Sequence, residues 1–300
     1  MTKKMSGMYA ALMTGLNDDG AFDEARQRAL TDYVLGQGLA GLYVGGSSGE
    51  AGLLDVEELS QQQGIVADCA QGRDTTLIAH VGMPNLRDSI RLAEQAAGLG
   101  YHALSALPPH SYPFSDAEIE GYYRDLAAAT DLPLIVYEVP VRTGRPIPLD
   151  SLVRILDLPN VSGIKFTSTD TFKFSMLRRQ RPDSSYFFGF DEIYTTGKVL
   201  GANGGIGTTY NLLGKLYVAL DAAMNDGDLR RAQELQDVSQ IFVEALLETG
   251  VLPGMKIALR LQGIDCGPTR APMALRMPED KAEAHMRAVL ERPEVKAWLS

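Results

Sequence analysis

Eight short apolar segments, each followed by a stretch of helical periodicity, predict an α/β fold: a (β/α)8 TIM barrel with a C-terminal helical appendage. The length of 300 residues suits one such barrel. A composition of 45% hydrophobic and 22% charged residues is typical of globular proteins and excludes a disordered or collagen-like chain. No Pro/Ser-rich linker or block of charge divides residues 1–226, so we expect one catalytic barrel there rather than two domains.

The eight predicted strands are continuous apolar runs, which is the pattern of parallel strands covered on both faces. They are, in order, Tyr9–Gly15, Gly41–Gly46, Thr76–Gly82, Ala103–Leu107, Leu134–Val139, Gly163–Thr167, Tyr186–Phe190 and Gly205–Thr209.

The helices between these strands have recognisable starts. Asp55 and Ser115 each precede a glutamate by three residues, which is the spacing of a capping box, and Asp150 is a candidate N-cap. Residues 227–300 form the predicted extension of three helices, Asp228–Glu248, Met255–Leu261 and Glu279–Leu299.

Charge and cysteine content restrict the partners and the compartment. The formal net charge of −10, with scattered basic residues, argues against nucleic acid and anionic membranes as partners. Cys69 and Cys266 lie far apart, so we expect reduced thiols and a cytoplasmic protein. No apolar run approaches the roughly 20 residues of a spanning helix. The four histidines lack metal-ligand spacing, so we expect no metal site.

Lys165 is the sharpest chemical signal in the sequence, because it lies inside an apolar strand between Ile164 and Phe166. Desolvation disfavours the ammonium form, and a neutral amine in an apolar pocket attacks ketones to form Schiff bases. The alternatives are a lysine whose ammonium group reaches solvent or pairs with a carboxylate at the barrel rim. Chemistry in such barrels takes place at the carboxyl ends of the strands, which favours the catalytic interpretation.

Two further segments end predicted strands with groups suited to an anion. Residues 45–50, Gly-Gly-Ser-Ser-Gly-Glu, offer backbone N–H groups and two hydroxyls for a carboxylate or phosphate, although an ordinary turn has the same composition. Tyr137 can shuttle a proton, and Arg142 can bind a carboxylate. Alternatively, Tyr137 is a core residue and Arg142 pairs with Glu138.

The seventh and eighth predicted strands end in Gly189-Phe190-Asp191-Glu192 and in residues 206–211, Ile-Gly-Thr-Thr-Tyr-Asn. Adjacent acids followed by a hydroxyl-rich loop suit hydrogen bonding to a polyol. A glycosidase-type pair of acids and an acidic helix N-terminus are the alternatives.

Together these segments closely resemble the N-acetylneuraminate lyase and dihydrodipicolinate synthase family of class I aldolases, from about Gly7 to about Gly263. The anchors are residues 46–50, Tyr137 with Pro140, and Lys165 in Gly-Ile-Lys. The resemblance implies a homotetramer without a cofactor that cleaves or condenses 2-oxo acids through a lysine–pyruvate imine.

The resemblance also implies a role for each matching residue. Lys165 would form the imine, Ser47 and Ser48 would hold the pyruvate carboxylate, and Tyr137, oriented by Ser47, would relay a proton. Further expected substrate-binding residues are Thr167, Gly189, Asp191, Glu192, Gly207 and Thr208, of which the acids and Thr208 would hold the sugar's glycerol tail.

The chain combines features of the two branches of this family. Residues 189–192 and 204–211 resemble the lyase branch, whereas Arg142 is similar to the arginine by which the synthase branch binds a second carboxylate. Glu138 replaces an asparagine common to both branches. Residues 108–114 depart from the usual tyrosine pair, one member of which reaches the neighbouring subunit's proton relay, so Tyr112 is the candidate for that catalytic role and His110 is the alternative.

We therefore expect a Schiff-base aldolase that cleaves N-acetylneuraminate, or a closely related 2-oxo sugar acid, to pyruvate and an aldehyde sugar. The alternatives are a synthase-like condensation of pyruvate with an aldehyde, and an aldolase or dehydratase of keto-deoxy sugar acids. From a different class, a non-catalytic sugar-acid binding protein would keep the same fold.

Overall fold

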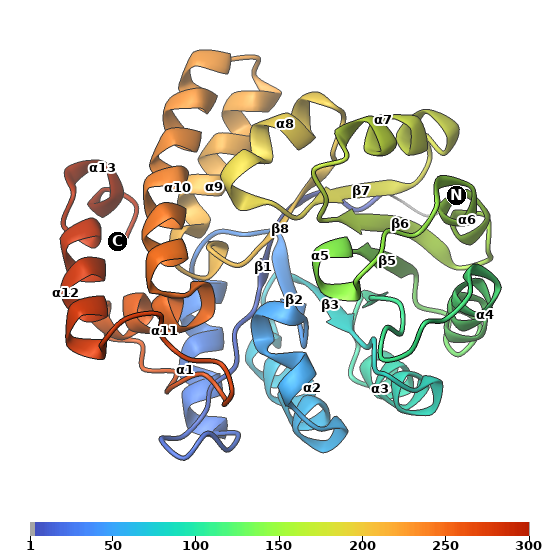
Figure 1. The fold of residues 1–300 in the computed structure, drawn as a ribbon, viewed down its shortest axis with the longest axis horizontal. Helices are drawn as coiled ribbons and strands as arrows, with labels where there is room; N and C mark the ends of the chain where they lie inside the picture. Colours follow the sequence, from blue (N-terminus) through green and yellow to red (C-terminus); the bar gives the residue numbers. More distant parts are fainter. Residues whose placement is uncertain (1–3, 300) are drawn as a thin grey trace.

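The computed structural model describes residues 4–299 and contains a closed barrel of eight parallel strands in sequential order, with β1 pairing with β8 (Figure 1). The predicted fold class and all eight predicted strands are confirmed, although most strands end before the loop residues that the apolar runs included. Their bounds are β1 Gly7–Ala11, β2 Gly41–Val44, β3 Thr76–His80, β4 Ala103–Ala106, β5 Leu134–Glu138, β6 Val161–Phe166, β7 Ser185–Phe188 and β8 Gly204–Gly207.

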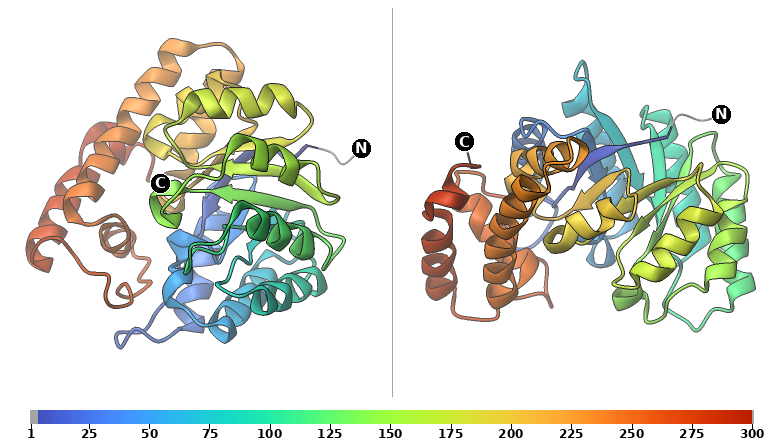
Figure 2. Two further views of the ribbon diagram at one scale, coloured as in Figure 1. Left: turned by 45° about the vertical axis from the view of Figure 1, so that its right-hand side comes forward. Right: turned by 90° about the horizontal axis from the view of Figure 1, so that it is seen from above.

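Helices surround the barrel as an outer layer (Figures 1 and 2). They are α1 Glu24–Leu35, α2 Val56–Ala70, α3 Leu86–Gly98, α4 Asp116–Ala127, α5 Pro140–Thr143, α6 Leu149–Leu156, α7 Thr171–Gln180, α8 Tyr194–Val199 and α9 Tyr210–Asn225. Short 3-10 turns follow β2, at η1 Ser47–Gly49 and η2 Ala51–Leu53, and β7, at η3 Asp191–Ile193.

Two of the three predicted helix starts are confirmed. Asp55 and Ser115 form complete capping boxes with Glu58 and Glu118. The prediction for Asp150 is wrong, because α6 already begins at Leu149 and its N-cap is Pro148. Asp150 instead lies in the first turn, where a carboxylate interacts favourably with the helix dipole.

The core has two layers, one inside the barrel and one between the barrel and its helices. The inner layer consists of buried strand residues, among them Tyr9, Tyr43, Ile135 and Phe187. The outer layer combines the alternate strand residues with the apolar faces of the helices. Adjacent residues of one strand therefore belong to different layers, and this alternation decides which side chains face the barrel interior.

The C-terminal extension differs in detail from the prediction. It comprises α10 Leu229–Thr249, α11 Val251–Leu261, α12 Glu279–Leu290 and the short α13 Pro293–Lys296, with α10 packed along α9 (Figure 1). The single helix predicted over Glu279–Leu299 is thus two helices, because Pro293 cannot continue a helix but suits the first turn of a new one. The division of the chain after residue 226 stays a prediction, and its outer limits at residues 1 and 300 lie outside the described residues. Within residues 4–299 no helix is both long and apolar enough to cross a membrane.

Candidate active site

A cavity of about 700 Å³ opens where the loops after β2, β3, β4 and β5 meet a segment of the C-terminal extension. Its wall includes Ser47, His80, His110, Arg142, Pro272 and Met273. The barrel thus places its cavity at the carboxyl ends of the strands, where this fold carries its chemistry. The last two of these residues show that the extension completes the wall.

Lys165 lies in the barrel interior next to Tyr137, its register partner on the neighbouring strand. Only 4% of Lys165 is exposed, and its Nζ lies 4.1 Å from the ring centroid of Tyr137 and 4.3 Å from that of Tyr43. No ion pair joins it to a carboxylate within the described residues. Burial lowers the pKa of Lys165, although Tyr137 and Asp191 act in the opposite direction. The amine is therefore easier to deprotonate than an ordinary lysine, as imine formation requires.

Tyr137 is buried at the end of β5 and is the group best placed to move a proton beside Lys165. Burial alone would raise the pKa of its phenol, but the positive charges of Lys165 and Arg142 and the hydroxyls of Ser47 and Thr167 lower it overall. A phenol that ionises more readily suits the predicted relay. Ser47 also lines the cavity, so it connects the open space with the buried pair.

The turn after β2 is folded tightly, which accounts for its glycines. Gly45 has φ +73°, and a Cβ on Gly46 would lie 2.5 Å from the Tyr43 ring. This compact turn presents Ser47 and Ser48 at the start of η1. The Ser48 Oγ lies 2.7 Å from the Thr208 Oγ1, so two predicted substrate-binding residues are adjacent in space.

Asp191 and Gly207, also predicted from the sequence, are in close contact. Asp191 is buried, and its Oδ2 accepts hydrogen bonds from the Thr209 backbone N–H (2.8 Å) and from the Thr209 hydroxyl (2.7 Å). A Cβ on Gly207 would lie 2.1 Å from the Asp191 Oδ1. Burial raises the pKa of Asp191 to about 6, despite the hydrogen bonds from Thr209 that lower it.

The neighbouring substrate-binding candidates are arranged by similar close approaches. A Cβ on Gly189 would lie 1.9 Å from the Thr167 Oγ1, so only glycine fits beside that hydroxyl. Glu192 is half-buried in η3, and its backbone carbonyl accepts a hydrogen bond of 2.9 Å from Gln240 on α10. Gln236 of the same helix donates to the Asp191 carbonyl at 2.9 Å. Sequence reasoning missed both glutamines, because nothing local links α10 to the end of β7.

Tyr43 and His80 are two further residues of the site that sequence reasoning did not select. The Tyr43 hydroxyl donates to the Ser105 Oγ at 3.0 Å, while its ring faces Lys165. Burial lowers the pKa of His80 to about 3. Its Nδ1 lies 2.9 Å from the Gly45 carbonyl, and its Nε2 accepts from the Leu107 backbone at 3.3 Å, so the ring is neutral. The sequence feature that could have indicated His80 is a polar side chain at the end of an apolar strand.

Glu50, the last residue of the same turn, ties the C-terminal extension to the barrel. It is buried, forms an ion pair of 2.9 Å with Lys256 of α11 and accepts a hydrogen bond of 2.7 Å from the Arg270 backbone. These contacts hold the segment that places Pro272 and Met273 against the cavity.

Arg142 is exposed in α5 and lines the cavity, without an ion pair to any carboxylate within the described residues. The alternative that Arg142 pairs with Glu138 is wrong, because Glu138 is fully buried and pairs with Lys173 at 2.9 Å. Sequence reasoning did not foresee this second pair. A direct contact of Arg142 with the substrate stays a prediction.

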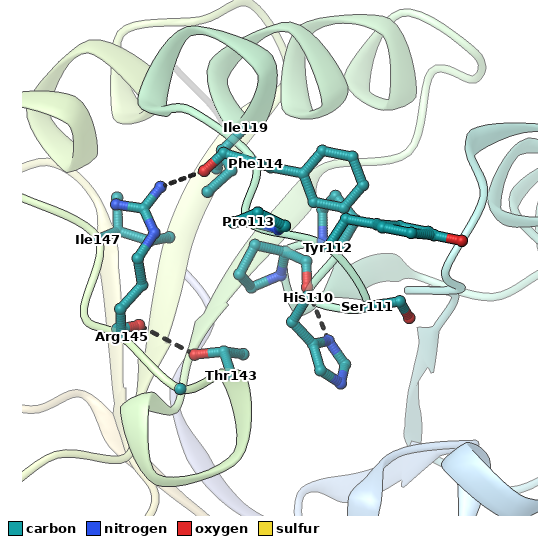
Figure 3. Close-up of a pocket in the computed structure, with 12 residues that line it drawn as sticks. His110, Ser111, Tyr112, Pro113, Phe114, Ile119, Thr143, Arg145 and Ile147 are labelled. Atoms are coloured by element: carbon teal, nitrogen blue, oxygen red, sulfur yellow. Dashed lines mark hydrogen bonds between the residues drawn. The ribbon is translucent and has the colours of Figure 1, made fainter.

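Tyr112, predicted to be catalytic, lies apart from the cavity. It is 74% exposed and lines a separate groove of about 380 Å³ together with Thr143 and Arg145 (Figure 3). His110 lines both spaces. Within one chain, His110 is thus the nearer of the two candidates, and a role for either one in a neighbouring subunit stays a prediction. In residues 4–299 no three His, Cys, Asp or Glu side chains gather closely enough to hold a metal ion.

The arrangement as a whole is suited to carbonyl chemistry. It combines a buried amine, an adjacent phenol of lowered pKa and a cluster of hydroxyl and backbone donors. The amine can attack a ketone, the phenol can move a proton, and the donors can hold a carboxylate.

Comparisons with known proteins agree with this chemistry. The N-acetylneuraminate lyase of Rhizobium meliloti is 43% identical over 269 residues, which is 90% of this chain and 89% of the relative. The N-acetylneuraminate lyase of Salmonella agona is 40% identical, over 91% of this chain and 93% of the relative. Among solved structures, that of CdNal from Clostridium difficile in complex with mannosamine superimposes with a TM-score of 0.92 at 30% identity, covering 99% of this chain and 100% of the other.

The match to a family covers nearly the whole chain. It extends over residues 4–291, which include the barrel, Lys165, Tyr137 and most of the C-terminal extension. The chain therefore belongs to the dihydrodipicolinate synthetase family.

Proposed function

We propose that this chain is a class I aldolase that cleaves N-acetylneuraminate, or a closely related 2-oxo sugar acid, to pyruvate and an aldehyde sugar. The observation that carries the proposal is the buried Lys165 amine beside Tyr137. The identity of more than 40% to a relative named N-acetylneuraminate lyase supports the choice of substrate.

The reaction begins when the Lys165 amine attacks the C2 ketone of the open-chain substrate; with a proton taken up from solvent, water is lost and a protonated imine remains. Tyr137, as the phenolate, then takes the proton of the 4-hydroxyl, and the C3–C4 bond breaks as the aldehyde forms. The bond's electron pair moves into the imine and leaves a pyruvate enamine. Protonation of C3 and hydrolysis of the imine release pyruvate and restore the lysine. The protonated imine is itself the electron sink, so the proposed reaction needs no cofactor.

Substrate binding would divide between the two sides of Lys165. Ser47 and Ser48, with the N–H groups of their turn, would hold the pyruvate carboxylate. The sugar's hydroxyls would meet acids, hydroxyls and glycine backbone groups beyond β6, β7 and β8; these are Thr167, Gly189, Asp191, Glu192, Gly207 and Thr208. The close approaches of Gly207 to Asp191 and of Gly189 to Thr167 support a common sugar-binding region, and the Ser48–Thr208 contact places it next to the turn that would hold the carboxylate.

Arg142 favours a second candidate within the same chemistry. A cationic side chain in the cavity wall suits a substrate with a second carboxylate, such as a keto-deoxy sugar diacid, or a synthase-like condensation with an aldehyde that bears a carboxylate. For such a substrate, Arg142→Leu would cost roughly 2–5 kcal/mol of binding free energy.

We also propose a homotetramer located in the cytoplasm. The exposed rings of Tyr112 and Phe172 support contacts between subunits, and the two free cysteines suit a reducing compartment.

The test begins with pyruvate and borohydride, followed by mass spectrometry of the digested protein. We expect one reduced pyruvyl adduct, located at Lys165, and none in Lys165→Met. An unmodified Lys165 would refute the aldolase mechanism and would leave the non-catalytic sugar-acid binder as the better interpretation.

A panel of 2-oxo acids, each assayed for pyruvate release, then identifies the substrate. Turnover of N-acetylneuraminate that is lost in Glu192→Ala and retained in Arg142→Leu supports the lyase. Preference for a diacid, abolished in Arg142→Leu, supports the second candidate.

A further inference from the structure

The loop between β5 and α6 carries Arg142 but has little structure of its own. Up to Pro148, the N-cap of α6, it spans residues 139–147 and contains only the four-residue helix α5. A single turn of helix is not stable in isolation, because nucleation costs more than one hydrogen bond returns. Contacts outside the loop must therefore hold Arg142 in the cavity wall.

One such contact is the Glu138–Lys173 pair, which holds both backbone groups of Ile147. The Ile147 N–H donates to the Glu138 Oε1 at 3.2 Å, and the Ile147 carbonyl accepts a hydrogen bond from the Lys173 Nζ. The two side chains are joined by the 2.9 Å ion pair. Glu138 ends β5 and Ile147 ends the loop, so the pair closes the loop at its base.

The sequence around Ile147 makes this contact consequential. Pro146 and Pro148 have no backbone N–H, so Ile147 provides the only backbone donor of this tripeptide. That donor is buried and would be costly to leave unpaired. Glu138 meets this requirement from its own strand, while its neighbour Tyr137 lies beside Lys165.

Stability alone gives a poor explanation of the Glu138–Lys173 pair. Both side chains are almost completely buried, and desolvation of two charges commonly offsets their mutual attraction. An apolar pair of similar volume would fill this space at least as well. What the charged pair provides, and an apolar pair does not, is one acceptor and one donor at fixed positions for Ile147.

A second set of contacts restrains the loop from the other side (Figure 3). Arg145 donates to the Asp116 carboxylate at 2.7 Å and to the Phe114 carbonyl at 2.8 Å. Within the loop, the Thr143 hydroxyl donates to the Arg145 carbonyl at 3.0 Å. These residues are half-exposed, so this side alone would restrain the loop weakly. The buried Glu138–Lys173 pair is the firmer attachment.

We propose that Glu138 and Lys173 are positioning residues, which hold Ile147 so that Arg142 stays in the cavity wall and near Tyr137. The inference rests on the proposed function for its effect on catalysis. Its structural part, the attachment of the loop, can be measured without any substrate.

The first experiment measures hydrogen–deuterium exchange in the wild type, Glu138→Gln and Lys173→Met. We expect peptides covering residues 139–147 to exchange about tenfold faster in both variants, with the rest of the barrel unchanged. Asp221→Asn is the matched control, because it breaks a comparably buried ion pair, with Lys198, between α8 and α9. Unchanged exchange over residues 139–147 in a folded variant would overturn the proposal.

The second experiment is a double-mutant cycle with Arg142→Leu, using N-acetylneuraminate as the substrate. Glu138→Gln should lower kcat/KM in the wild type by no more than Arg142→Leu itself does, and most on the rising limb of the pH profile, because a displaced guanidinium cannot cost more than a removed one. In Arg142→Leu, the same substitution should change kcat/KM less than about twofold. Lys173→Arg, which keeps the charge and the donor, should retain most of the activity.

The controls separate the two proposals. Reduction with pyruvate and borohydride should still modify Lys165 in Glu138→Gln, because the imine does not involve Arg142. An equal loss of kcat/KM with and without Arg142 would mean that Glu138 acts on the whole fold, and would overturn its positioning role. A wild type that forms no imine would refute the proposed function, while the exchange experiment would still decide whether the pair holds the loop.

Discussion

Asp191→Asn should stabilise the protein at neutral pH, because the native Asp191 carboxylate is ionised in a buried position. Burial raises its pKa from the ordinary 3.8 to about 6. One pKa unit corresponds to 1.36 kcal/mol, so ionising Asp191 in the folded protein costs about 3 kcal/mol more than in the unfolded chain. The neutral amide keeps an oxygen acceptor for the Thr209 N–H and removes this cost.

The pH dependence of this effect has a definite sign. Because the folded protein binds the Asp191 proton more tightly than the unfolded chain does, the contribution to stability is greatest below about pH 4. It is lost as the pH rises to about 6 and is constant above that value. The difference in unfolding free energy between Asp191→Asn and the wild type should therefore grow by about 2 kcal/mol between pH 4 and pH 7, because at pH 4 the unfolded carboxyl is already partly ionised.

Urea unfolding at a series of pH values, at one fixed protein concentration, measures this difference. Any constant offset introduced by the amide does not change with pH, so the slope alone tests the argument. Thr209→Val removes a hydroxyl that lowers the pKa of Asp191, and it should therefore extend the pH dependence to higher pH and increase its total size. A difference between Asp191→Asn and the wild type that is flat from pH 4 to pH 7 would refute the reasoning. If the variant also binds the sugar acid more weakly, the carboxylate is kept for its ligand at a cost in stability.

Three further predictions concern the proton relay, the cavity wall and the C-terminal extension. Tyr137→Phe should lower kcat about 10²- to 10⁴-fold in the assay of pyruvate release. Borohydride should still trap pyruvate on Lys165 in this variant, and a loss of that adduct would contradict a role of Tyr137 confined to the proton relay. Arg142→Leu should raise the pKa of Tyr137, because the guanidinium lowers it in the wild type. The rising limb of the kcat/KM profile should then move to higher pH, and an unmoved limb would mean that the Arg142 charge does not act on the proton relay. Lys256→Met should lower the unfolding free energy by roughly 3–5 kcal/mol, because it leaves Glu50 buried without its cation. Arg230→Met, at an exposed ion pair, should change the unfolding free energy by less than about 1 kcal/mol in the same urea titration, and an equal loss in the two variants would contradict this comparison.

The fold could be predicted from local patterns because each strand is an apolar run that parallel pairing buries on both faces. Lys165 and Tyr137 could be selected for the same reason, since a polar group in such a run needs an explanation. The capping boxes at Asp55 and Ser115 are equally local, because each involves residues three positions apart. Asp150 shows the limit of this reasoning, since Pro148 occupies the position that the pattern assigned to it.

The missed features all join residues that are distant in the sequence. Glu50 of the barrel meets Lys256 of the C-terminal extension, and Glu138 at the end of β5 meets Lys173 on α7. The residues next to a glutamate or lysine in the sequence do not identify its ion-pair partner, and both residue types are usually exposed. Sequence reasoning could therefore offer Arg142, a near neighbour, only as an alternative partner for Glu138, whereas packing buried Glu138 beside Lys173.

The sequence alone was enough to predict the barrel and to select the amine and the phenol of the proposed reaction, because burial pattern and residue type are properties of short segments. Which charges pair depends instead on the folded chain. It gave Glu138 to Lys173 and Glu50 to Lys256, and it left Arg142 in the cavity wall without a carboxylate partner among residues 4–299. The physical reason is that pairing depends on distance in space, which the closure of the barrel sets, and not on distance along the chain.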